Sequence, residues 1–164
     1  MENIDIKELE KILVIIKDAP SIRVGHFSSC CDNIAILLEK FSKEREYEYI
    51  LYATNQEYAT KIKEQINSAK FFNLARAKYM LNGKFFDYLF VTADIEDKES
   101  FIKKAHAIIK NSGEILIFYK SQDYAIKDSW YRLLEENYYV ATNSIKIDND
   151  YSVIVSKKMH GWGG

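Results

Sequence analysis

Residues 138–156, with the sequence YYVATNSIKIDNDYSVIVS, contain two strand-like stretches separated by a short polar connection. Residues 138–147 and 151–156 are rich in the β-branched and aromatic residues that strands favour. Asp148, Asn149 and Asp150 lie between them, and so short a turn-forming connection demands an antiparallel hairpin. The chain is therefore predicted to end its sheet with a hairpin.

Upstream of the hairpin, strand-like and helix-like segments alternate. A helix is expected within residues 1–20, where Asp5 can cap it and Pro20 stops it, and Asp32 and Asn55 can cap two later helices. A further helix is expected to end at Gly113 in a left-handed cap, and the last helix covers residues 124–136. Strands are predicted at residues 21–27, 47–53, 74–79, 85–92 and 114–119. This alternation predicts right-handed crossovers and a mostly parallel sheet.

Length and composition fit one globular domain. The chain has 164 residues, of which 48% are hydrophobic and 29% charged, and these proportions exclude a disordered or fibrous class. The formal charge is -1, with basic and acidic residues interleaved, so no nucleic-acid partner is expected. No apolar run is long enough to cross a membrane, and a cytoplasmic location is expected. We predict an N-terminal helix in residues 1–20, a core in residues 21–158 and a tail in residues 159–164.

The predicted order of elements resembles the class I S-adenosylmethionine-dependent methyltransferases. The resemblance covers residues 21–158, and it is most specific in residues 86–94, FDYLFVTAD, and 109–118, IKNSGEILIF, which are similar to the family's fourth and fifth motifs. It implies a three-layer, doubly wound α/β fold with a mostly parallel seven-stranded sheet, in which the C-terminal hairpin inserts the final strand beside the fifth. S-adenosylmethionine is the cofactor that the resemblance implies.

The same residues are similar to the metal-dependent O-methyltransferases of the caffeoyl-CoA type. In that group two acidic residues bracket an alanine at the end of the fourth strand, but here Thr92 replaces the first and only Asp94 remains. Lys120, Ser121 and Gln122 stand where the group has an Asp-Asn pair after the fifth strand. Mg²⁺ requires several oxygen ligands, so no metal is expected.

The cofactor motifs of the family are only partly present. When residues 23–29, RVGHFSS, are aligned with the family's glycine loop, only Gly25 is retained. Arg23 stands at the acidic position, and Phe27 and Ser29 stand at the second and third glycines. The Phe27 ring is expected to occupy the space that a ligand needs. Ser28, Ser29 and the helix N-terminus that follows can still hold an anion.

Asn55 stands near the end of the second strand, where the family has a carboxylate for the ribose hydroxyls. It is either a weaker ribose contact or simply the cap of the next helix. By resemblance, Gly25, Ser28, Ser29 and Asn55 would surround the nucleoside, and Asp94 would lie near the substrate.

Three further features have a functional and a structural interpretation. His26, at the carboxyl end of the first strand, is either a base or ligand contact or a hydrogen-bonded structural histidine. The adjacent Cys30 and Cys31 either include a reactive thiolate at a helix start or are small packing residues. The tail His160-Gly161-Trp162-Gly163-Gly164 places its indole either on its own domain or on a partner.

Two functional hypotheses remain open at this stage. The first is a small-molecule methyltransferase that uses S-adenosylmethionine through a divergent cofactor loop, with His26 and Asp94 as candidate catalytic residues. The second is a catalytically inactive protein that keeps the methyltransferase fold as a binding or assembly module, with self-association as one possibility. A different nucleotide in the same crevice is a third possibility, because a fold does not determine its ligand.

Overall fold

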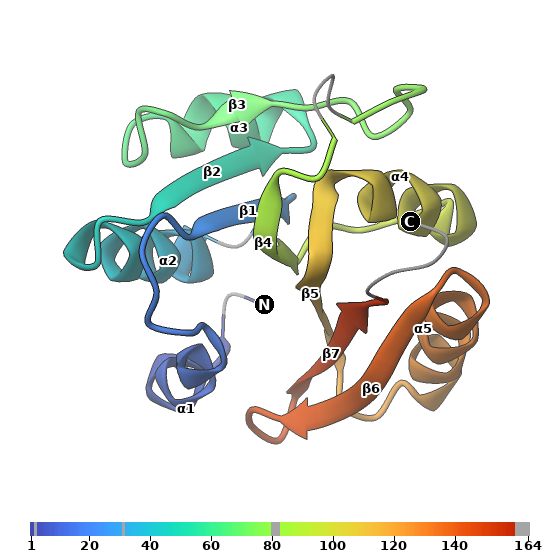
Figure 1. Cartoon of the computed structure of the whole chain (residues 1–164). Coiled ribbons are helices and arrows are strands. Elements are labelled where there is room, and N and C mark those ends of the chain that lie inside the picture. The colour runs from blue at the N-terminus through green and yellow to red at the C-terminus, as the bar shows by residue number, and fades with distance from the viewer. Residues whose placement is uncertain (2, 31, 80–82, 160–164) are drawn as a thin grey trace.

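The computed structural model describes residues 1, 3–30, 32–79 and 83–159. Its strands form one sheet in the spatial order β3, β2, β1, β4, β5, β7, β6, and Figure 1 shows β3 and β6 at opposite edges. The strands are β1 (Arg23–Ser28), β2 (Glu48–Ala53), β3 (Lys70–Phe71), β4 (Phe86–Val91), β5 (Ile109–Lys120), β6 (Tyr139–Lys146) and β7 (Tyr151–Lys158). The helices are α1 (Ile6–Ile12), a short 3-10 turn (Leu13–Ile15), α2 (Asp32–Glu44), α3 (Gln56–Ile62), α4 (Lys98–Ile108) and α5 (Tyr124–Glu136).

The strand directions confirm the predicted fold class. β1 to β5 are parallel to one another, whereas β7 is antiparallel to both β5 and β6. The C-terminal hairpin thus inserts β7 beside β5, as the resemblance implied. A parallel sheet requires crossover connections, and α2, α3 and α4 provide them.

Helices cover both faces of the sheet and bury different side chains of the same strands. On one face, Leu9 of α1 and Leu38 of α2 belong to a core cluster with Val24 and Phe90, and α3 packs beside them over β2. On the other face, α4 and α5 pack against alternate residues of β1 and β4, among them Phe27 and Leu89. Because successive strand residues point to opposite faces, β1 and β4 are buried on both.

Two predicted details of the elements are wrong. Residues 74–79 form no strand; the third strand is the two-residue β3, and the segment after it folds as a loop that buries Tyr79. Gly113 does not cap a helix, because α4 already ends at Ile108 and Gly113 lies inside β5. There a side chain would meet the Ile109 Cγ2 atom at 2.7 Å, so close packing explains the glycine.

The N-terminal helix is shorter than the predicted segment. Asp5 caps α1 as expected, since its carboxylate accepts hydrogen bonds from the backbone N–H groups of Lys7 and Glu8. The helix ends at Ile12 and the chain continues through the 3-10 turn. Within the described part of the chain, no helix combines the length and the apolar character needed to cross a bilayer.

His26 lies in the core of the sheet. Its side chain is fully buried, its Nδ1 atom lies 2.8 Å from the Tyr49 hydroxyl, and its Nε2 atom lies 2.7 Å from the Thr92 hydroxyl. Burial lowers its pKa from 6.5 to about 3. This placement corrects the expectation of a base or ligand contact and supports the alternative, a hydrogen-bonded structural histidine.

Acid should destabilise the protein through His26. The folded protein keeps this histidine neutral, whereas the unfolded chain binds a proton near the ordinary pKa of 6.5. The stability that this residue contributes is therefore complete above pH 6.5 and is lost as the pH falls toward 3, at up to roughly 1.4 kcal/mol per pH unit. Urea unfolding at about pH 7.5 and about pH 5 should show a larger loss in the wild type than in His26→Gln, which cannot titrate. An equal loss in both proteins would contradict this account.

Candidate functional site

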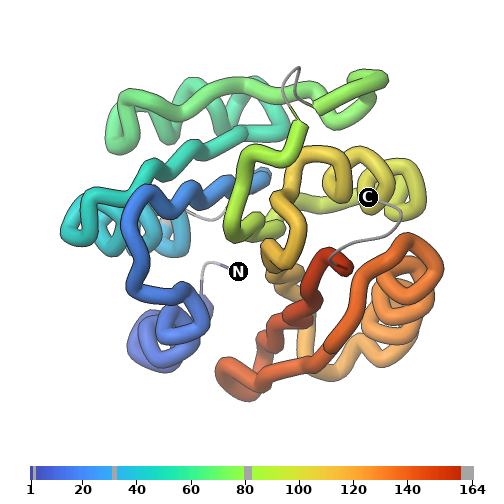
Figure 2. Tube along the Cα trace, viewed as in Figure 1, coloured from blue at the N-terminus to red at the C-terminus, as the bar shows by residue number. Residues whose placement is uncertain are grey.

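The carboxyl ends of β1 and β4 form a topological switch point. From β1 the chain turns toward β2 on one side, and from β4 it turns toward β5 on the other. Figure 2 shows this division, with the blue-to-green half of the chain on one side of the molecule and the yellow-to-red half on the other. In open α/β sheets, ligands bind in the crevice outside the carboxyl ends of such strands.

Gly25 and Arg23 lie away from this crevice. Gly25 is in the middle of β1, paired with Ile50 of β2 and Leu89 of β4, and an added Cβ would approach the Phe86 ring within 2.8 Å. The Arg23 Nε atom lies 3.1 Å from the Glu48 Oε2 atom at the opposite end of the strand. The alignment that put these two residues on a cofactor loop is therefore corrected: β1 continues to Ser28 and the turn follows it.

Phe27 belongs to an aromatic cluster inside the core. Its ring centroid lies 5.1 to 5.7 Å from those of Tyr52, Phe72, Tyr79 and Phe101, and its side chain is fully buried. The expectation that this ring fills the ligand space is corrected accordingly, because it packs below the switch point and lines neither cleft described below.

The turn after β1 is tied to its neighbours by hydrogen bonds. The Ser29 hydroxyl accepts a hydrogen bond of 3.2 Å from the Asp94 backbone N–H, and the Ser29 carbonyl accepts one of 3.0 Å from the Asn55 Nδ2 atom. The Asn55 Oδ1 atom accepts from the Tyr58 N–H at 2.7 Å, which confirms its role as the α3 cap. Ser28 is buried, and its carbonyl accepts from the Thr54 N–H at 2.9 Å.

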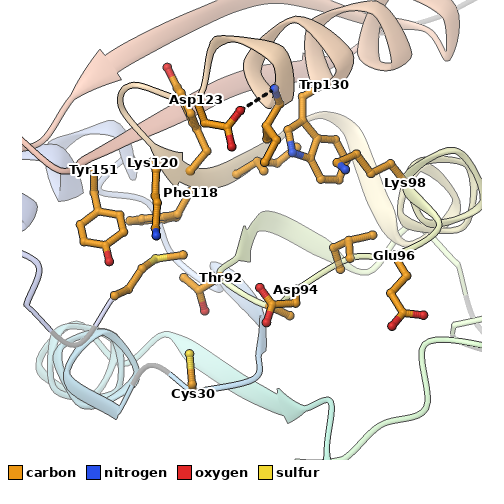
Figure 3. A pocket seen from close by; sticks show the side chains of 16 residues that line it. Cys30, Thr92, Asp94, Glu96, Lys98, Phe118, Lys120, Asp123, Trp130 and Tyr151 are labelled. Atoms are coloured by element: carbon orange, nitrogen blue, oxygen red, sulfur yellow. Dashed lines mark hydrogen bonds between the residues drawn. The ribbon is translucent and has the colours of Figure 1, made fainter.

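Two clefts meet at Asp94, three residues after the end of β4. The β5 cleft has a volume of about 440 Å³ and lies over the ends of β4 and β5 (Figure 3); its lining includes Cys30, Thr92, Phe118, Lys120, Trp130 and Tyr151. The β2 cleft has a volume of about 480 Å³, and its lining includes Thr54, Asn73, Leu74, Tyr79, Asp97 and Phe101. Asp94, Ile95 and Glu96 line both. Each volume lies within the range of small-molecule sites.

The β2 cleft combines apolar walls with uncharged polar groups, three acids and one lysine, Lys104. Burial and the nearby Asp97 carboxylate raise the pKa of Tyr79 to about 12, so its hydroxyl stays neutral and donates to the Leu74 carbonyl at 3.0 Å. Asp94 and Glu96 are exposed where the two clefts meet. This arrangement suits a ligand with an apolar, hydrogen-bonding body and a cationic centre.

Some of these residues could be anticipated from the sequence and others could not. Asp94 was predicted at the substrate, and its place between the clefts is compatible with that role. Trp130 and Tyr151 were missed as site residues, because α5 and β7 reach the cleft only through tertiary packing. Lys120 was noted only as a departure from a metal motif, although its place at the end of a parallel strand was a usable signal.

The two cysteines and the C-terminal tail were the other candidate functional features. Cys30 is exposed beside the β5 cleft, whereas Cys31 and the tail residues 160–164 lie outside the described residues. Among the described residues, no group of three or more histidine, cysteine, aspartate or glutamate side chains could hold a metal ion.

Comparison with known proteins identifies the fold. No protein-family sequence model matches the chain, and no curated protein is significantly similar to it in sequence. An S-adenosylmethionine-dependent O-methyltransferase from Thermotoga maritima superposes on 100% of this chain and 69% of its own, with a TM-score of 0.75 and 12% identity. A methyltransferase from Aquifex aeolicus gives a TM-score of 0.71 and 11% identity, with 96% and 92% of the two chains covered.

Larger methyltransferases show the same core. The CurJ carbon methyltransferase gives a TM-score of 0.71 at 10% identity, and the match covers 93% of this chain. The chain spans about half of that structure, 52% of its length. At these identities the likeness concerns the arrangement of the backbone, and the chain has the fold of the class I S-adenosylmethionine-dependent methyltransferases.

Proposed function

We propose that this protein transfers a methyl group from S-adenosylmethionine to a small molecule. The observation that carries the proposal is the pair of clefts that meet at Asp94, at the carboxyl edge of the sheet beside the β1–β4 switch point. One cleft would hold the cofactor and the other the methyl acceptor. The methyltransferase fold supports this division, since the structures it resembles are described as methyltransferases.

The β2 cleft fits the adenosyl part of the cofactor. Leu74, Ile95 and Phe101 provide apolar surface for a purine ring, and Thr54 and Asn73 provide hydrogen-bonding groups beside it. Thr54 and Asn55 follow β2, so this fit relies on uncharged groups where the related family uses a carboxylate. We therefore expect modest affinity.

Asp94 fits the cationic part of the cofactor. Its carboxylate is exposed where both clefts meet, and its backbone N–H is held by the Ser29 hydroxyl. When bound, S-adenosylmethionine supplies a methyl group activated on a sulfonium; an acceptor lone pair forms the new bond to carbon as the sulfur–carbon bond breaks, leaving S-adenosylhomocysteine. The protein's contribution is to hold the acceptor in line and to exclude water.

Blocking the β2 cleft should abolish cofactor binding. Ala75 lines this cleft and is exposed, so Ala75→Trp fills the space without disturbing the core. Isothermal titration with S-adenosylhomocysteine should show an affinity at least about tenfold lower than in the wild type. Ala77→Trp is the matched control, because Ala77 is exposed in the same loop but does not line the cleft. Equal binding by both variants would place the ligand elsewhere.

Removing the Asp94 charge should discriminate between the two forms of the cofactor. S-adenosylmethionine carries a sulfonium charge that S-adenosylhomocysteine lacks, and an exposed charge pair contributes roughly 1 kcal/mol. In Asp94→Asn, affinity for the sulfonium form should fall about fivefold while affinity for S-adenosylhomocysteine changes by less than about twofold. The exposed Asp128 on α5 lies outside both clefts, and Asp128→Asn is the control. An equal loss of affinity for the two ligands would show that the Asp94 carboxylate does not interact with the sulfonium.

A binding or assembly module is the second candidate, and the turn after β1 favours it. The side chains of Ser29 and Asn55 link this turn to the segments after β4 and β2, in place of a glycine loop open to a ligand. If a correctly folded wild type releases no heat with either cofactor form at millimolar concentration, this candidate replaces the first. Light scattering of the full chain and of a chain ending at Lys158 would then test self-association through the tail.

A further inference from the structure

We propose that the β5 cleft binds an aromatic carboxylate, with the carboxylate group held between the Lys120 ammonium and the Tyr151 hydroxyl. The statement that this ligand is the methyl acceptor rests on the proposed function. The statement that the cleft binds such a ligand rests on the cleft alone.

Lys120 and Tyr151 stand together because of strand register. They are partners in the antiparallel ladder of β5 and β7, and partners of this kind point to the same face with Cβ atoms about 5 Å apart. Phe118 precedes Lys120 by two residues and therefore lies on that face too. Figure 3 shows Lys120 and Tyr151 extending from one wall of the cavity into it.

Two lysines line the cleft: Lys120 lies at one end, and Lys98 lies beside Trp130, with its Nζ atom 5.6 Å from the ring centroid. Among the described residues no carboxylate forms an ion pair with Lys120, and the Asp123 carboxylate on the same wall accepts a hydrogen bond from the Ile126 N–H as the cap of α5. Asp94 and Glu96 lie on another wall, toward the β2 cleft. A ligand whose anionic end lies at Lys120 would thus extend its other end toward Asp94.

The cleft between these ends suits a flat apolar body. Phe118, Trp130 and Ile126 line it, and Phe118 and Trp130 have 6% and 4% of their surfaces exposed. At the Lys120 end of the cleft, one ammonium group and one hydroxyl match the two oxygens of a carboxylate. The combination indicates an aromatic acid.

The test is isothermal titration of the full chain with benzoate, para-hydroxybenzoate and indoleacetate, each paired with its neutral amide. At least one acid should bind about tenfold more tightly than its amide. Lys120→Met keeps the apolar stem and should abolish this preference, and Tyr151→Phe should weaken acid binding about threefold while leaving the amide unchanged. Lys40→Met is the control, because Lys40 is exposed on α2 and lines neither cleft. Thermal unfolding of each variant verifies its fold.

S-adenosylhomocysteine titrated into the same samples separates the two proposals. If it binds but no acid does, or if acids bind equally well to Lys120→Met, the inference is overturned and the proposed function stands. If acids bind with the expected preference but S-adenosylhomocysteine does not bind, the anion site stands and methyl transfer is overturned. If both ligands bind as expected, both proposals are supported.

Discussion

The interior strand β1 is hydrogen-bonded on both edges, to β2 and to β4, and the rest of the molecule depends on this constraint. Because it runs parallel to both neighbours, the ends of all three strands lie at one edge of the sheet, and the chain leaves them in opposite directions. Helices must then cover both faces, which fixes the three layers. The space left at that edge is where both clefts form.

Much of this architecture could be predicted, because the local sequence signals favour the same helices, strands and turns that the tertiary packing requires. The α5 boundaries, residues 124–136, and the turn at residues 148–150 are fixed by a capping aspartate and by turn residues. The third strand was misplaced for the opposite reason. Residues 74–79, LARAKY, contain a single aromatic residue and belong to a loop whose Tyr79 packs on Phe27, while the true β3 is two exposed residues with no distinctive pattern.

The site was harder to predict than the fold, since a site depends on where a strand stops and which face a side chain takes. A cofactor loop predicted a few residues too early placed Gly25 and Arg23 at a turn that begins only after Ser28. His26 was expected at the carboxyl end of β1, but it lies two residues before that end and its side chain is fully buried. Lys120 and Tyr151 meet only through β5–β7 pairing, which joins positions far apart in the chain.

Gly25 has a consequence for how homologous sequences of this fold should be compared. The Phe86 ring on the neighbouring strand occupies the place of its missing side chain, so selection for packing alone would preserve the glycine. A glycine conserved at this position in homologous sequences could then be mistaken for the remnant of a nucleotide-binding motif. Covariation with position 86 would distinguish packing from ligand binding as the reason for the glycine. A glycine retained for packing tolerates replacement only when the residue at position 86 becomes smaller.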